Sequence, residues 1–152
     1  MDSAEAQLET FMARYLPGVA GMGRAAIKRM RARLPGCDAL VYDNYNALAV
    51  GFSPNGKTGA AIVSIALYTR WVSLFFLRGA GLPDTDNLLK GNGSAVRHIV
   101  LGSADDLDLP PVRDLIDRAL AAAAMPHDPA RKGALMIKAI SEVQRPRRPA
   151  KG

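Results

Sequence analysis

The feature that most constrains the fold is a series of short apolar runs in the middle of the chain. Rich in Val, Ile, Leu and aromatic residues, they lie at 40–45, 47–53, 60–68 and 71–77. Pro54-Asn55-Gly56-Lys57 is typical of a hairpin loop, and Thr69-Arg70 suits a second tight reversal. Parallel neighbours would need connections of about a dozen or more residues, usually a helix. Such short turns therefore predict an antiparallel meander.

Helical periodicity appears on both sides of this meander. Leu8, Phe11, Met12, Tyr15 and Leu16 recur at the spacing of one helix face. A second helix is predicted over 20–34, ending at Pro35-Gly36. A third is predicted to begin at Asp108, before two prolines that suit a first helical turn, and to run to about 124.

The remaining strands complete the predicted architecture. Residues 96–101 have the composition of a fifth strand, and 134–141 would suit a sixth at an edge of the sheet. The order of elements predicts an α+β fold. We expect an antiparallel sheet of about five or six strands, with two N-terminal helices and one C-terminal helix packed on it.

Positive charge is concentrated at the C-terminal end. The chain has 152 residues and a net charge of +6. Residues 127–152 hold seven basic and two acidic side chains, whereas 1–126 are close to neutral. The sequence therefore predicts a domain over 1–126 and a basic extension over 127–152, disordered beyond the strand at 134–141. The proline-spaced Arg145, Arg147 and Arg148 would either pair with phosphates of a nucleic acid or act as a solubilising tail.

Cellular location is suggested by what the sequence contains. A single cysteine, Cys37, cannot form an internal disulfide, and the acidic first residues resemble no secretory signal. The longest apolar stretch, 59–69, is much shorter than the ~20 residues that cross a bilayer. We therefore expect a cytoplasmic protein with no membrane partner. The oligomeric state stays open.

The glycine-rich segment between residues 77 and 98 is the most informative candidate site. Glycine clusters let backbone amides converge on an anion, and basic side chains can add charge-assisted contacts. The predicted ligand-binding residues are Lys90, Gly91, Gly93, Arg97 and His98, with Asp84 shaping the loop. Neither the dinucleotide fingerprint nor the phosphate-binding loop pattern is present. The alternative is that these glycines only permit tight turns.

The same segment resembles a known family. Gly79, Leu82 with Asp84, Leu88-Leu89-Lys90-Gly91, Gly93 and Arg97-His98 are similar to the pattern of the YdhG-like proteins. This bacterial family of unknown function is grouped with YjbR-like and frataxin-like proteins. Asp43-Asn44-Tyr45 matches the polar and aromatic entry to the sheet in that family. The resemblance covers about 8–124 and implies an antiparallel sheet backed by terminal helices.

Metal binding is a further possibility that the resemblance raises, since some relatives are described as iron chaperones. Asp105, Asp106 and Asp108 form an acidic cluster before the third helix, and such oxygens suit hard cations. A capping turn is the alternative role. His98, His127 and Cys37 lack the spacing of metal ligands. We therefore predict no metal site and no cofactor.

No enzyme class is supported, because no acid, base and nucleophile occur at a recognisable spacing. Trp71, Phe75 and Tyr68 could form a stacking platform, but Trp71 and Phe75 share a face of one strand and are predicted to be core residues. The sequence favours a non-catalytic module that binds a small anionic ligand or a protein partner. The first alternative is a nucleic-acid-associated protein that uses the basic tail. The second is iron binding or delivery of the frataxin kind.

Overall fold

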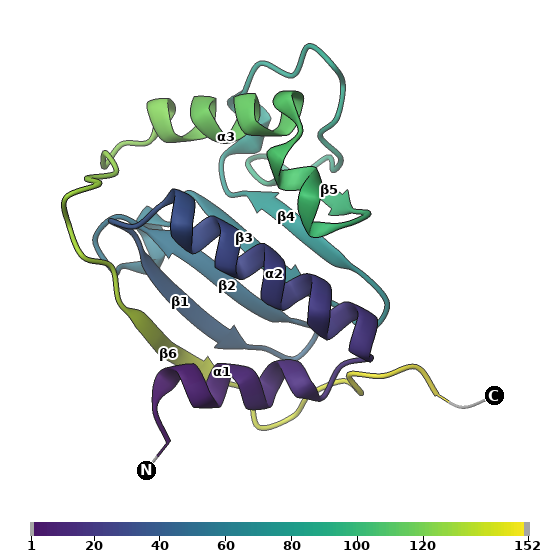
Figure 1. Ribbon diagram of the computed structural model, residues 1–152. Coiled ribbons are helices and arrows are strands. Elements are labelled where there is room, and N and C mark those ends of the chain that lie inside the picture. Colours follow the sequence, from purple (N-terminus) through teal and green to yellow (C-terminus); the bar gives the residue numbers. More distant parts are fainter. Residues whose placement is uncertain (1, 151–152) are drawn as a thin grey trace.

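A six-stranded sheet with helices beside it forms the centre of the computed structural model, which describes residues 2–150 (Figure 1). The α-helices are α1 (Ala4–Ala13), α2 (Pro17–Arg33) and α3 (Pro110–Ala122). The strands are β1 (Asp38–Asp43), β2 (Leu48–Ser53), β3 (Val63–Leu67), β4 (Val72–Phe76), β5 (Arg97–Leu101) and β6 (Leu135–Ile140). Short 3-10 helices are η1 (Thr58–Ala60), η2 (Gly79–Gly81) and η3 (Ala104–Asp108).

The sheet is mixed, which corrects the prediction of a purely antiparallel one. Its strand order is β5-β4-β3-β2-β1-β6, and β1 to β5 form the antiparallel meander that the short turns predicted. Strand β6 lies parallel to β1. The chain returns after α3 to the end of the sheet where β1 begins: the Gly133 amide donates to the Pro35 carbonyl at 2.9 Å, and the Ala39 amide to the Ala134 carbonyl at 2.8 Å. Strands β1 and β6 therefore begin at the same end of the sheet and run in the same direction.

The N-terminal helices begin where local capping favours them. The Ser3 side chain accepts a hydrogen bond from the Ala6 amide at 3.1 Å, and Pro17 occupies the first turn of α2. Helix α2 crosses the sheet in front of β3 and β2 (Figure 1). At Gly23 a Cβ would lie 2.6 Å from the Leu67 side chain, so the missing side chain lets helix and strand approach closely.

Helix α3 lies differently from the prediction. It does not lie across the sheet but beyond the ends of its strands, close to the C-terminal half of α2 (Figure 1). The Arg33 guanidinium of α2 donates to the Arg113 carbonyl at 3.1 Å and pairs with Asp117. Val112, Leu115 and Ile116 of α3 are nevertheless buried in the common core. No helix in the described part of the chain is long and apolar enough to cross a bilayer.

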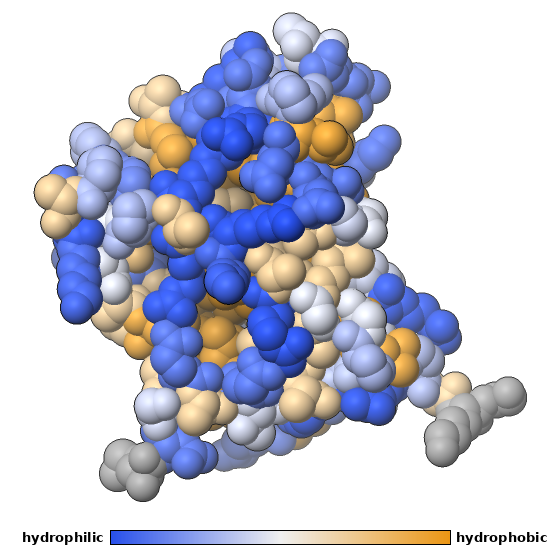
Figure 2. All heavy atoms as spheres, viewed as in Figure 1, coloured by the Kyte–Doolittle hydropathy of each residue, from blue (hydrophilic) through white to orange (hydrophobic). Residues whose placement is uncertain are grey.

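The core fills the space between the sheet and the helices. Val72, Leu74 and Phe76 of β4 are 0% exposed and belong to it. Since side chains alternate along a strand, Trp71 and Phe75 lie on the opposite face. Trp71 is 44% exposed, so its prediction as a core residue was wrong. The helix-bearing side carries many hydrophilic side chains, with apolar patches between them (Figure 2).

The C-terminal segment contacts the body from Gln144 to Arg148, which differs from the expectation of disorder after 141. Arg147 is 6% exposed, and its guanidinium pairs at 2.9 Å with the buried Asp43 carboxylate. Arg14 of the N-terminal region pairs with the same carboxylate at 2.7 Å. The guanidinium of Arg147 also lies 5.7 Å from the Tyr15 ring centroid. The extension thus contacts the domain through β6 and through residues up to Arg148; Lys151, counted in the basic extension, lies outside the described residues.

Candidate functional site

The predicted glycine-rich site forms a closed loop. The amide of Lys90 donates to the His98 carbonyl at 2.8 Å, and the His98 amide returns a bond to the Lys90 carbonyl at 2.9 Å. Residues 91–96 therefore form a short excursion from the sheet edge. Gly91 has φ +113°, a conformation that favours glycine, and a Cβ there would lie 3.6 Å from Arg97 Cδ. Gly93 faces open space.

Two charged members of the predicted site have internal partners. The Asp84 carboxylate accepts the amides of Leu88 and Leu89, each at 2.9 Å, and so stabilises a turn. Arg97 Nη1 donates to the Gly93 carbonyl at 2.6 Å and to the Val96 carbonyl at 2.9 Å. The structure thus brings Lys90, Gly91, Gly93, Arg97 and His98 together around one loop. The Asp84 carboxylate instead binds backbone amides of the turn that follows it.

The tail arginines have separate environments. Arg147 is buried on Asp43, and Arg148 donates to the Arg14 carbonyl at 3.0 Å. Arg145 is exposed, with its guanidinium 5.6 Å from the Tyr45 ring centroid. Of the three residues predicted for the nucleic-acid alternative, Arg145 alone presents a guanidinium with no acceptor among the described residues.

The acidic cluster serves the fold in the structure. Asp106 and Ser103 form a capping box at η3, and Arg29 of α2 pairs with both Asp105 and Asp108. Within residues 2–150, no three His, Cys, Asp or Glu side chains gather closely enough to hold a metal ion. These contacts explain the cluster without a cation.

Cys37 is unsuited to nucleophilic chemistry. It is 5% exposed, and burial raises the pKa of its thiol to about 11. The Arg131 guanidinium acts in the opposite direction but does not compensate for desolvation. Because the thiolate is the reactive form, this side chain is a core residue.

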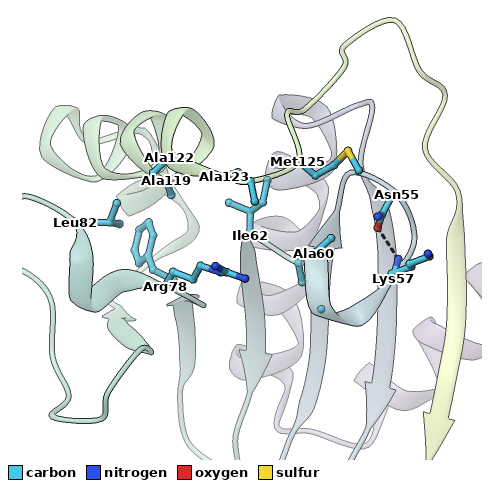
Figure 3. A pocket seen from close by; sticks show the side chains of 14 residues that line it. Asn55, Lys57, Ala60, Ile62, Arg78, Leu82, Ala119, Ala122, Ala123 and Met125 are labelled. Atoms are coloured by element: carbon cyan, nitrogen blue, oxygen red, sulfur yellow. Dashed lines mark hydrogen bonds between the residues drawn. The ribbon is translucent and has the colours of Figure 1, made fainter.

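A cavity that the sequence did not suggest lies between the end of the sheet and α3 (Figure 3). Its volume is about 480 Å³, within the usual range for small-ligand sites. Three segments line it: the turn and η1 after β2, the end of β4 with η2, and the C-terminal part of α3. The lining residues are Asn55, Lys57, Gly59, Ala60, Ala61, Ile62, Phe76, Arg78, Leu82, Ala119, Ala122, Ala123, Ala124 and Met125.

Hydrogen bonds hold the wall of this cavity that follows β2. The Ser53 hydroxyl donates to the Lys57 carbonyl at 2.8 Å, and the Lys57 amide donates to Asn55 Oδ1 at 2.9 Å (Figure 3). The hydroxyls of Tyr42 and Thr58 are hydrogen-bonded to each other, which ties η1 to β1. This wall is therefore preorganised, and preorganisation lowers the entropy cost of ligand binding.

The chemistry of the cavity is apolar with an unpaired cation. Its lining contains no acidic residue. Arg78 extends from the end of β4 below Ile62, whereas the Lys57 side chain points away from Ala60 (Figure 3). Within residues 2–150, Arg78 has no ion pair and no side-chain hydrogen bond, unlike eleven of the fourteen arginines. A guanidinium without an internal acceptor beside an apolar hollow is suited to an anionic group on an apolar molecule.

Comparison with family models, with curated proteins and with solved structures found no match to this chain. The resemblance to the YdhG-like proteins stays a prediction.

Proposed function

We propose that this chain is a non-catalytic binding module of the YdhG-like kind whose ligand is a small molecule with an apolar body and one anionic group. The observation that carries the proposal is the unpaired Arg78 beside a cavity of about 480 Å³. The glycine-rich loop predicted from the sequence lies next to this cavity. Gly79, which follows Arg78, packs so closely on Arg97 of that loop that a Cβ at Gly79 would lie 2.6 Å from Arg97 Cβ.

The position of the anionic group follows from the electrostatics of the cavity walls. The C-terminal end of α3, which carries the partial negative charge of the helix dipole, lies across the cavity from Arg78 (Figure 3). An anion is therefore expected at the Arg78 side, where a bidentate pair with the guanidinium can form. The apolar body would then contact the alanines of α3 together with Ile62 and Leu82.

The experiment is a thermal-unfolding screen with three matched ligand sets. Medium-chain and aromatic carboxylates form the first set, the corresponding neutral alcohols the second, and sugar phosphates the third. A ligand at a hundred times its Kd adds about 2.7 kcal/mol, which raises the Tm of a chain of this size by roughly 5–10 °C. We expect this shift with an apolar carboxylate and a smaller one with its alcohol.

Two variants locate the binding. Arg78→Gln should weaken carboxylate binding by roughly 10-fold or more, because it removes a charge-assisted hydrogen bond. Arg70→Gln is the matched control, since Arg70 is also exposed and unpaired within residues 2–150 but lies outside the cavity. Ala122→Phe should fill the cavity and abolish binding of acid and alcohol alike. No shift with any ligand, or equal losses in the two arginine variants, would contradict the proposal and favour a protein partner.

A further inference from the structure

Four aromatic rings form a continuous row on the sheet face opposite α2. Trp71 and Tyr68 flank the β3–β4 hairpin and stack with centroids 5.0 Å apart and planes 17° apart. Phe75 of β4 lies 6.5 Å from Tyr68, and His98 of β5 lies 5.3 Å from Phe75. The row therefore extends from the hairpin to the edge of the sheet.

The aromatic row is partly exposed to solvent, and small residues lie between its rings. Trp71 is 44% exposed and Val100, on the same face of β5, is 51% exposed. Ser73 and Ala66, which pair between β4 and β3 among these rings, are 1% and 3% exposed. The small side chains of Ser73 and Ala66 lie between the rings, which leaves a shallow apolar platform. Exposing large apolar side chains to water is unfavourable, so an exposed apolar patch of this kind marks a binding surface.

Two unpaired cations lie at the hairpin end of this platform. Arg70 sits in the turn between Tyr68 and Trp71, and the neighbouring Thr69 hydroxyl donates to the Pro146 carbonyl at 3.3 Å. That contact brings Arg145, the residue before Pro146, to the same end of the sheet. Within residues 2–150, neither arginine pairs with a carboxylate.

We propose that this face binds single-stranded nucleic acid. Unpaired bases would stack on the row that starts at Trp71, and phosphates would pair with Arg70 and Arg145. Aromatic rings on a sheet with cations at one end suit a flexible strand, because its bases are free to unstack from each other and lie on a flat surface. A duplex keeps its base faces stacked inside and so offers nothing for these rings to stack on. The nucleic-acid surface thus combines this sheet face with one arginine of the C-terminal extension.

Trp71 is the single tryptophan of the chain, so its fluorescence reports on this surface directly. Titration with a twelve-nucleotide oligothymidylate should quench it, whereas a duplex of equal length and inorganic polyphosphate should leave it largely unchanged. Affinity for a fluorescein-labelled oligonucleotide, measured by anisotropy, should fall roughly 10-fold or more in Trp71→Leu and in Phe75→Leu. Circular dichroism of both variants checks that they fold.

Salt dependence separates stacking from charge. Each phosphate contact on a single strand contributes about −0.7 to the slope of log K against log salt concentration. The double variant Arg70→Gln/Arg145→Gln should therefore reduce the slope by about 1.4. Arg24→Gln/Arg113→Gln is the control with the same loss of charge on the helix side. The proposal is overturned by polyphosphate binding as tightly as the oligonucleotide, by no quenching, by folded Trp71→Leu binding normally, or by an acidic peptide that competes with equal affinity and so marks a protein-docking face.

Discussion

Replacement of Arg147 by Met tests whether the C-terminal segment belongs to the folded unit. The Asp43 carboxylate is 1% exposed and has two cationic partners, Arg147 at 2.9 Å and Arg14 at 2.7 Å. The Arg147 side chain is 4% exposed, whereas that of Arg14 is 43% exposed. Removing one partner of a buried pair costs about 3–5 kcal/mol, because the remaining charge stays desolvated. Since Arg14 still pairs with Asp43, we expect the lower end, about 3 kcal/mol.

That loss of stability should lower the Tm by roughly 6–12 °C in a chain of this length. The measurement is urea and thermal unfolding followed by circular dichroism. Arg145→Met is the matched control: it removes the same charge two residues earlier, where the guanidinium is exposed over Tyr45, and should cost no more than about 1 kcal/mol. In the Asp43→Asn background, Arg147→Met should cost less than in the wild type. Equal unfolding midpoints for the two arginine variants would refute the argument that this segment is docked.

Three further predictions concern the end of the sheet where β1 and β6 begin. At pH 8 the Cys37 thiol, with a pKa of about 11, should react with iodoacetamide roughly 100-fold more slowly in the folded protein than after unfolding. Burial opposes ionisation of Asp38, but hydrogen bonds from Arg131 and a backbone amide outweigh it and lower its pKa. Asp38→Asn should therefore cost stability above about pH 4, and the difference from wild type should shrink as pH falls through the folded-state pKa, as urea titrations in a series of steps downward from pH 7 would show. Gly36→Ala places a Cβ 1.7 Å from the Asp128 carbonyl oxygen, so a loss of more than about 2 kcal/mol is expected in the same titrations.

The meander could be predicted from sequence because its signals are local. A two-residue turn at Thr69-Arg70 permits only antiparallel neighbours, and the structure has the Tyr68 amide bonded to the Trp71 carbonyl at 2.8 Å. The direction of β6 could not be predicted in this way. Its partner is more than ninety residues earlier in the chain, and the contact that sets it, the Ala134 amide on the Asp38 carboxylate, exists only in the folded state.

The aromatic row illustrates a limit of sequence patterns in strands. The alternation of side chains shows which residues share a face of the sheet, but not which of the two faces is buried. Residues 71–76 carry apolar side chains at almost every position, so both faces of β4 look suited to a core. The one polar residue, Ser73, shares its face with Trp71 and Phe75. Its polarity was the only sequence feature of this strand that indicated which face is exposed to solvent. The cavity has no such signal, because the three segments that line it are separated by up to about forty residues of chain.

Net charge alone is a poor guide to the proposed binding surfaces, because most arginines of the described residues have internal partners. The basic extension suggested a free polycation, yet Arg147 and Arg131 pair with buried carboxylates and Arg148 with helix carbonyls. A guanidinium already paired inside the protein has fewer free donors and less uncompensated charge to offer an external anion. Within residues 2–150, the arginines without such partners are Arg70, Arg78 and Arg145. One faces the apolar cavity and two lie at the aromatic row. The unpaired arginines, rather than the total charge, are therefore what support the two proposed anion-binding surfaces.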